Sequence, residues 1–424
     1  MADSLAWTAD SSPHRGGRDA RHDKMERPRT ESAMAEPLMV LSKTFQDFVR
    51  SEKAGGLLLV ACTVFSLAIA NSPAGGGYAD LWQEVYAGLS LEHWINDALM
   101  AVFFLFVGLE LERELYNGEL SDWRNAALPI VAAIGGALVP AGIHLAFNAG
   151  TPTADGAGIP MATDIAFALG ILALVGDRVP LSLRIFLTAL AVIDDLLAIV
   201  VIAVFYTNKL DVNWLLAALA VFSGLVLLNR RRVMTLWPYL LGGAFMWWLM
   251  LKSGVHPTLA GVMLAFAIPF SPRAEDLTSP SHRIENALHK PVAFVVLPLF
   301  ALANTGLVIS AGWMAELVST NGLGIIAGLA LGKPLGIVLF SLLAIRLGWS
   351  RMPPGLTWRH LLGAGMLGGI GFTMAIFIAN LAFSGRPELV DASKMAILAG
   401  SLVAGLAGWL WLRFASATAV TPAR

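Results

Sequence analysis

Two neighbouring aspartates, Asp194 and Asp195, lie in the middle of an apolar run that extends from residue 181 to residue 207. An ionised aspartate at the centre of a membrane helix costs about 2.5–3.5 kcal/mol on insertion scales, so a pair of them indicates a function. The alternative is a purely structural salt bridge between helices. Because consecutive helix residues point about 100° apart, one carboxylate can face a cavity while its neighbour reaches another helix. The two aspartates therefore suit different roles in one ion site.

Lys333 lies near the middle of another apolar run, within Gly332-Lys333-Pro334. A lysine at that depth needs a buried counter-charge, and either Asp194 or Asp195 is a natural candidate. Such a pair could serve transport, or it could only stabilise the fold.

Asp164 follows Thr163 where glycines and Pro160 interrupt an apolar run. Its carboxylate could offset the positive end of a half-helix, which is a structural role. It could also coordinate a cation together with an oxygen of Thr163, because hard cations prefer oxygen ligands. The two interpretations are compatible.

Close carboxylates such as these offer a simple exchange chemistry. Two like charges at short distance cannot both ionise readily, whereas a bound cation favours the charged forms and expels the protons. If the same carboxylates bind protons or a cation but not both, alternating exposure to the two sides of a membrane produces antiport without another coupling device.

A second charged cluster, formed by Glu110, Glu112, Arg113 and Glu114, ends an earlier apolar run. Glu110 and Glu114 are four residues apart and share a helix face. The cluster could attract ions or respond to pH, or it could consist of ordinary helix-end charges in water. His256 has a side chain suited to titration near neutrality, but it is predicted at the opposite membrane face, where a lone histidine is more often structural.

The composition shows which elements must position these residues. Of the 424 residues, 56% are hydrophobic and 14% are charged, and the mean hydropathy is +0.67, whereas soluble domains contain about 25% charged residues. We predict an all-α integral membrane protein with about twelve transmembrane helices, each near the ~20 residues that a bilayer requires. The predicted spans are 54–71, 95–116, 126–148, 159–175, 181–207, 213–228, 236–251, 255–270, 291–310, 322–345, 361–383 and 394–414.

The polar ends flank one predicted domain. Residues 1–36 have too few apolar side chains to form a core and are predicted to be a disordered cytoplasmic tail. Residues 37–415 form a single transmembrane domain, and residues 416–424 form a short cytoplasmic tail. Lys and Arg concentrate on the loops of one side, which places both termini in the cytoplasm. The charge pattern predicts no nucleic-acid partner, and a single cysteine, Cys62, excludes an intrachain disulfide.

Two of these spans, the fourth and the eleventh, read as discontinuous. The fourth contains Gly156 to Asp164, and the eleventh contains five glycines between residues 363 and 371. Each interruption is central in a group of three spans, 126–207 and 322–414. Interrupted helices at corresponding positions of two inverted-topology repeats are typical of the binding site of a secondary transporter.

Six motifs carry a resemblance to a known family. They are Val107-Gly-Leu-Glu, Ala162-Thr-Asp-Ile-Ala-Phe-Ala-Leu-Gly, Ile193-Asp-Asp-Leu, Leu251-Lys-Ser-Gly-Val-His, Gly332-Lys-Pro-Leu-Gly and Gly369-Ile-Gly-Phe-Thr-Met. In this order, across about residues 40 to 415, the sequence resembles the NhaA family of sodium/proton antiporters, itself an example of inverted-repeat transporters.

The resemblance implies twelve helices with two crossed, broken ones, and a cytoplasmic funnel. It implies pH-regulated, electrogenic exchange by alternating access in the bacterial inner membrane, with two protons entering for each Na⁺ or Li⁺ that leaves. It implies Na⁺, Li⁺, H⁺ and membrane lipids as partners and no cofactor. Residues 73–93 would form a small extracellular hairpin, through which a homodimer is plausible.

The resemblance also implies roles for single residues. Asp195 would be the principal cation ligand, and Asp194 would pair with Lys333 when no ion is bound. Thr163 and Asp164 would compensate charge or coordinate the ion at the crossing. Matches to positions for pH response or ion access are Glu110, Arg113, Glu114, His256 and Glu285, and Asp97 matches a carboxylate on the periplasmic route. Glu112 stands where a basic residue is expected and Asn286 where a histidine is expected, which puts the pH of activation in doubt.

Two other classes of protein remain as alternatives. A passive cation channel would also use carboxylates, but its transport would not depend on a proton gradient. An intramembrane aspartyl protease would share a proton between Asp164 and Asp195. That reading leaves Lys333 and the two interrupted spans unexplained.

Overall fold

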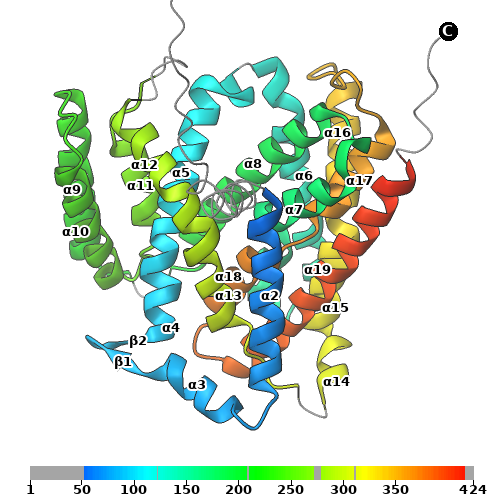
Figure 1. Cartoon of the computed structure of the whole chain (residues 1–424), viewed down its shortest axis with the longest axis horizontal. Coiled ribbons are helices and arrows are strands. Elements are labelled where there is room, and N and C mark those ends of the chain that lie inside the picture. Colours follow the sequence, from blue (N-terminus) through cyan, green and yellow to red (C-terminus); the bar gives the residue numbers. More distant parts are fainter. Residues whose placement is uncertain (1–51, 122, 208–209, 272–277, 310–311, 416–424) are drawn as a thin grey trace, which may run out of the picture. The chain divides into compact units, whose positions relative to one another are not determined.

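A computed structural model describes residues 52–121, 123–207, 210–271, 278–309 and 312–415. These residues are mostly helical (Figure 1). The predicted tails, 1–36 and 416–424, lie outside the described residues, so their disorder and the bounds of the single domain stay predictions.

The elements follow one another as helices (α), short 3₁₀ or π-helical turns (η) and two strands (β). They are α2 (Glu52–Ala70), α3 (Gly75–Gln83), β1 (Val85–Tyr86), β2 (Leu89–Ser90), α4 (Leu91–His93), η1 (Trp94–Leu99), α5 (Met100–Asn117), η2 (Glu119–Ser121), α6 (Trp123–Asn148), η3 (Ala154–Met161), α7 (Ile165–Val175), η4 (Gly176–Arg178), α8 (Leu181–Phe205), α9 (Val212–Arg230), α10 (Trp237–Ser253), α11 (Leu259–Ala267), α12 (Pro280–Pro291), η5 (Val292–Val296), α13 (Leu297–Asn304), α14 (Trp313–Leu317), α15 (Thr320–Ala327), η6 (Gly328–Gly332), α16 (Lys333–Arg346), α17 (Trp358–Gly368), α18 (Phe372–Ala382) and α19 (Pro387–Ala415).

The helices have the length and composition of a multi-pass membrane protein. Within the described residues, eight are long and apolar enough to cross a membrane, or up to ten if each of two bent helix pairs is one span. The bent pairs are α2 with α3, at 114°, and α17 with α18, at 47°. Helices α10 and α11 lie where two more spans were predicted, but they have 17 and 9 residues, fewer than the ~20 that a span requires. The count of about twelve therefore stays a prediction.

One predicted span was misplaced. Sequence predicted a span at 291–310, whereas α12, η5 and α13 run without interruption from Pro280 to Asn304. The sequence of α12 is PSHRIENALHKP. Its polar side chains lower the local hydropathy, so the hydropathy pattern did not indicate that these first turns belong to the span. Residues 73–93, where the resemblance placed a small hairpin, contain α3 and the antiparallel strands β1 and β2.

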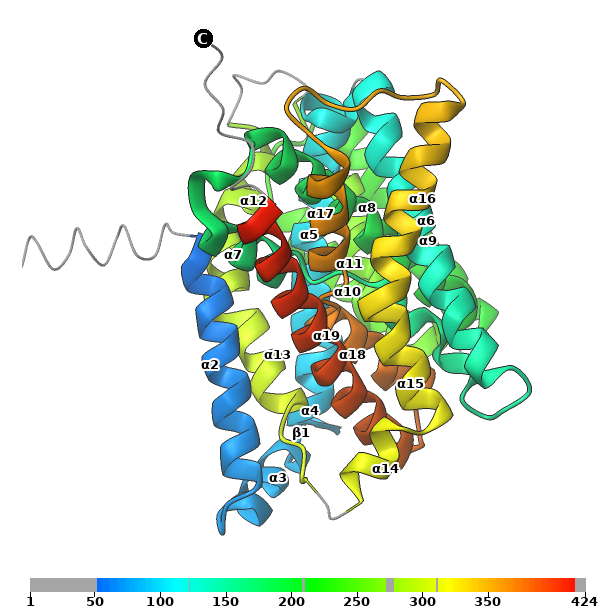
Figure 2. The same ribbon diagram turned by 90° about the vertical axis from the view of Figure 1, so that its right-hand side faces the viewer.

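The apolar side chains form two clusters of buried residues. The larger joins α6, α7, α8 and α15 to α19, and it also includes parts of α2, α5 and α13. The smaller joins α9, α10, α11 and one face of α5. Figure 1 shows α9 beside α10, and Figure 2 shows α15 and α16 running beside α6. The two clusters meet along α5, whose residues contribute to both.

Helices α6 and α16 approach each other backbone to backbone. A β-carbon built on Gly336 would lie 2.1 Å from the carbonyl oxygen of Gly135, and one built on Gly135 would lie 2.4 Å from the carbonyl oxygen of Gly336. Small residues allow such close packing of membrane helices. This contact fixes the start of α16, where Lys333 is the first residue.

Both predicted interruptions coincide with breaks in regular helix. The 3₁₀ turn η3 is followed by Ala162, Thr163 and Asp164, which lie outside any helix, before α7 begins at Ile165. Between α17 and α18 the chain bends at residues 369–371. The backbone N–H of Asp164 donates to the carbonyl oxygen of Ile370 at 2.6 Å, so the two breaks contact each other directly.

Candidate ion-binding site

The two aspartates occupy the middle of α8, as the sequence predicted. Asp194 and Asp195 are each 2% exposed. The residues around them on α8 are apolar and mostly buried, so no counter-charge lies next to them on the helix. Their charges must be balanced by neighbouring elements.

Lys333 supplies one balancing charge. Its Nζ donates a hydrogen bond to Oδ2 of Asp194, and both side chains are fully buried. The residues alone left open which aspartate Lys333 would face, the resemblance implied Asp194, and in the structure Lys333 pairs with Asp194. The lysine follows η6, a π-helical turn, which is a local distortion often found at functional sites.

Thr163 joins the first break to α8 and to the second break. Its Oγ1 is 2.5 Å from Oδ2 of Asp194 and 2.7 Å from the carbonyl oxygen of Gly368. Asp194 Oδ2 therefore has two partners, the lysine and this threonine. This oxygen of the pair is well satisfied.

Asp164 is held by the two half-helices that follow the breaks. Its Oδ1 accepts from the backbone N–H of Phe167 at 3.1 Å, which caps α7. Its Oδ2 accepts from the N–H and the hydroxyl of Thr373, at 3.1 and 2.5 Å. These contacts fit charge compensation at helix N-termini. Thr373 belongs to the Gly369-Ile-Gly-Phe-Thr-Met motif, but no sequence pattern indicated its contact with Asp164.

Asp195 has no ion pair with Lys333. Its Oδ1 is buried and lacks a hydrogen-bond partner among the described residues, as does Oδ1 of Asp194. A buried polar atom without a partner is costly and calls for an explanation. A bound cation or a proton would satisfy these oxygens. The described residues contain no group of three or more His, Cys, Asp or Glu side chains suited to a resident metal.

The charged cluster at the end of α5 is a compact network. Arg113 lies 3.6 Å from Glu110, 3.2 Å from Glu114 and 3.2 Å from Glu285 of α12. The three carboxylates are largely buried, with side-chain exposures of 21%, 16% and 10%. Such burial does not fit ordinary helix-end charges in water. Glu112, 5% exposed, accepts a hydrogen bond from Ser281 at 3.2 Å, a contact that sequence did not suggest.

His256 and Asp97 form a separate pair near the opposite end of α5. His256 Nε2 lies 3.5 Å from Asp97 Oδ1, and its Nδ1 lies 2.6 Å from the Thr258 hydroxyl. Both residues line a cavity of about 240 Å³, together with Asn96 and Asn380. The structure thus brings His256 to Asp97 and not to the Arg113 network.

The helical architecture and the buried ion pair together define a class of protein. A multi-pass helical protein with a buried lysine–aspartate pair beside two contacting helix breaks is typical of an ion-coupled secondary transporter. The family model described as "Na+/H+ antiporter 1" matches residues 46–412. The chain belongs to this family, and it is therefore a secondary transporter of the antiporter class and not an enzyme.

Similar proteins agree with this assignment. The chain is 65% identical over 382 residues to the Na(+)/H(+) antiporter NhaA of Dechloromonas aromatica (strain RCB), covering 90% of this chain and 98% of the relative. It is 56% identical over 376 residues to Na(+)/H(+) antiporter NhaA 1 of Flavobacterium johnsoniae, covering 89% and 98%. Identity is 50% over 387 residues to Na(+)/H(+) antiporter NhaA 2 of Pseudomonas syringae pv. syringae (strain B728a), covering 91% and 97%. The protease alternative is wrong.

Proposed function

We propose that this chain extrudes Na⁺ or Li⁺ in exchange for H⁺ across the bacterial inner membrane, with Asp194 and Asp195 as the shared ion site. One observation carries the proposal: Lys333 neutralises Asp194, whereas the equally buried Asp195 has no ion pair in the described residues and leaves its Oδ1 without a partner. The names of the relatives, which are Na(+)/H(+) antiporters, support the same activity.

The exchange follows from competition for the carboxylates. In the proton-loaded form, Asp195 carries a proton and Asp194 pairs with Lys333. A dehydrated Na⁺ needs several oxygen ligands, which Asp195, Asp194 and Thr163 would supply, with Asp164 contributing charge. Binding draws Asp194 away from Lys333, so Asp195 releases its proton and the ammonium of Lys333, which has lost its counter-charge, releases a second one. Protonation from the other side reverses the sequence, so neither ion crosses alone.

Alternating access requires the site to face each side in turn. We propose that the contacting breaks near Thr163 and Ile370 are the crossed pair of two inverted repeats within about twelve spans. Exchange of about two protons for each Na⁺ moves one net charge inward, which gains about 2.3 kcal/mol per 100 mV of inside-negative potential. The membrane voltage would then drive Na⁺ out even when the pH gradient is small.

The charged groups away from the site suit ion access and pH regulation. The Arg113 network, with Glu110, Glu114 and Glu285, lies at the end predicted to be cytoplasmic, where both termini are also placed. His256 and Asp97 would lie on the periplasmic route. The hairpin in residues 73–93 would support a homodimer in contact with membrane lipids.

The test is cation-dependent dequenching of a pH-sensitive dye in everted membrane vesicles, across pH 6.5 to 8.5. Adding NaCl or LiCl should produce a signal in the wild type and in the control Asp80→Asn, an exposed carboxylate of α3. Asp195→Asn should produce none at any pH. Absence of a signal in well-folded wild type would sink the antiport proposal. In proteoliposomes without a pH gradient, an imposed K⁺ diffusion potential should accelerate electrogenic exchange and leave electroneutral exchange unchanged.

A further inference from the structure

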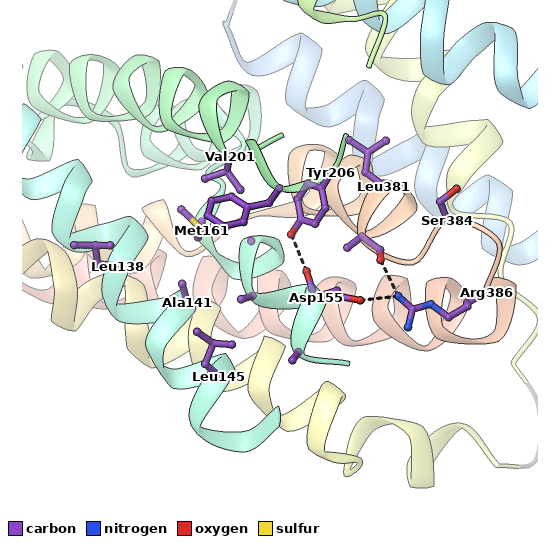
Figure 3. A pocket seen from close by; sticks show the side chains of 15 residues that line it. Leu138, Ala141, Leu145, Asp155, Met161, Val201, Tyr206, Leu381, Ser384 and Arg386 are labelled. Atoms are coloured by element: carbon purple, nitrogen blue, oxygen red, sulfur yellow. Dashed lines mark hydrogen bonds and ion pairs between the residues drawn. The ribbon is translucent and has the colours of Figure 1, made fainter. Parts of the chain in front are cut away.

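Arg386, in the turn between α18 and α19, holds the start of η3. Its guanidinium donates to the carbonyl oxygen of Pro152 at 2.8 Å. It also donates to Oδ2 of Asp155 at 3.1 Å and to the carbonyl oxygen of Ala382 at 3.0 Å (Figure 3). The guanidinium carbon also lies 5.1 Å from the centre of the Phe383 ring. An exposed ion pair contributes little by itself, but this arginine has three acceptors and an aromatic face in a fixed geometry.

Two aromatic side chains rest directly on the backbone of η3. A β-carbon built on Gly156 would lie 2.8 Å from Cζ of Phe383, and one on Gly158 would lie 2.6 Å from the hydroxyl oxygen of Tyr206. The Tyr206 hydroxyl donates to the carbonyl oxygen of Asp155 at 2.8 Å. Figure 3 shows Tyr206 and Arg386 approaching Asp155 from different elements. Residues 156 and 158 must therefore be glycine for Phe383 and Tyr206 to pack this closely on η3.

The elements joined here are the same ones that build the ion site. Turn η3 leads into Thr163 and Asp164, α18 contributes Thr373, and α8 carries the aspartate pair and ends just before Tyr206. These three elements are thus connected twice, once at the ion site and once beyond the end of α8, at Tyr206. The cavity that contains Asp97 and His256 lies between Tyr206 and the α10–α11 loop. A larger cavity, of about 630 Å³, is lined by η3, α6, the end of α8 and the α18–α19 turn, so the direct contacts of Arg386 and Tyr206 join these elements across its edge.

We propose that Arg386, Asp155 and Tyr206 form a clamp that stays closed during transport and holds the two broken helices and α8 as one body. The clamp thereby fixes the position of Thr163 and Asp164 relative to Asp194, which makes its members positioning residues and not ion ligands. This inference rests on the proposed exchange at that site. A gate that opens in every cycle would use the same contacts, and the two possibilities give opposite results when the clamp is cross-linked.

The experiment replaces the clamp by a covalent bridge. Because the chain has one cysteine, Asp155→Cys and Arg386→Cys are introduced into Cys62→Ser and joined with a short bis-methanethiosulfonate reagent, which can enter from the cavity of about 630 Å³ that Asp155 and Arg386 line. Before bridging, the apparent KM for Na⁺ should rise about three- to tenfold at a nearly unchanged maximal rate, as expected when binding geometry alone is loosened. Bridging should return the KM to within about twofold of the Cys62→Ser parent.

Several outcomes would overturn the clamp. Exchange that stops on bridging and returns with a reducing agent would show that these contacts must open. An unchanged apparent KM for Na⁺ before bridging would show that the clamp contacts do not position the ion site. Arg386→Lys should give a partial KM defect, because a lysine cannot reproduce the fork of donors, and the exposed Arg351→Gln should give none.

A binding readout separates the clamp from the proposed function. The Na⁺ concentration that gives half of the thermal stabilisation of the purified protein should rise in the unbridged double-cysteine variant and recover on bridging. A parent that is stabilised by Na⁺ but shows no exchange would refute the proposed antiport, while the same bridging series would still decide the clamp.

Discussion

The buried pair of Lys333 and Asp194 makes a strong prediction about stability. Both side chains are fully buried, and removing one partner of such a pair leaves an uncompensated buried charge at a cost of about 3–5 kcal/mol. Lys333→Met keeps the length and apolar stem of the side chain, so the loss of packing is small. We expect a lower melting temperature for the purified variant in detergent, and a larger decrease at alkaline pH, where Asp194 would have to carry its charge without the lysine.

The double variant decides whether the pair is the cause. If it is, Lys333→Met combined with Asp194→Asn should be much less destabilised than the sum of the two single variants, with a coupling of roughly 2–3 kcal/mol. Lys252→Met, an exposed lysine at the end of α10, controls for loss of positive charge and should change little. Additive single effects, or a decrease in the control as large as in Lys333→Met, would refute the reasoning.

Two further predictions concern the helix breaks and the helix contact behind Lys333. Thr373→Val removes the hydroxyl that donates to Asp164, and a hydrogen bond to a charged group contributes about 1.5–3 kcal/mol. Its melting temperature should fall and its apparent KM for Na⁺ should rise, whereas Thr373→Ser should retain both, and equal behaviour of the two variants would contradict this role. Gly336→Ala places a β-carbon 2.1 Å from the Gly135 carbonyl oxygen and should cost about 1–3 kcal/mol through overpacking. Gly142→Ala in α6, where no atom lies within 4 Å, should be neutral or stabilising by up to about 1 kcal/mol; comparison of their thermal unfolding checks both.

The residues most readily identified from the sequence are the charged ones that lie within apolar runs. A carboxylate or a lysine within an apolar run has a large insertion cost, so Asp194, Asp195 and Lys333 stand out without any knowledge of the fold. Thr163 and Asp164 were indicated by the glycines and the proline that interrupt their helix. The structure brings Thr163 and Lys333 to Asp194, although the roles of these residues remain predictions.

Sequence could not supply the features that depend on which surfaces meet. Apart from the resemblance, the residues did not decide between Asp194 and Asp195 as the partner of Lys333, because that choice depends on the register of α8 against α16. A threonine such as Thr373 is inconspicuous in a membrane helix, because its hydroxyl can bond to its own backbone and gives no compositional signal. The polar helix α12 was missed because hydropathy detects apolar length, whereas α12 packs beside a charged network that makes its polar residues acceptable.

The distribution of partners among the three buried aspartates explains why a single site could couple two ions. Asp164 is satisfied by N–H and hydroxyl donors that cannot leave, so its charge is a fixed part of the site. Asp194 is satisfied by Lys333, a partner that can be exchanged for a cation. Asp195 Oδ1 has neither among the described residues, so its charge must be matched by whatever enters. In the proposed exchange, a cation entering the site displaces a proton from Asp195 and competes with Lys333 for Asp194, and a site with only permanent donors could do neither.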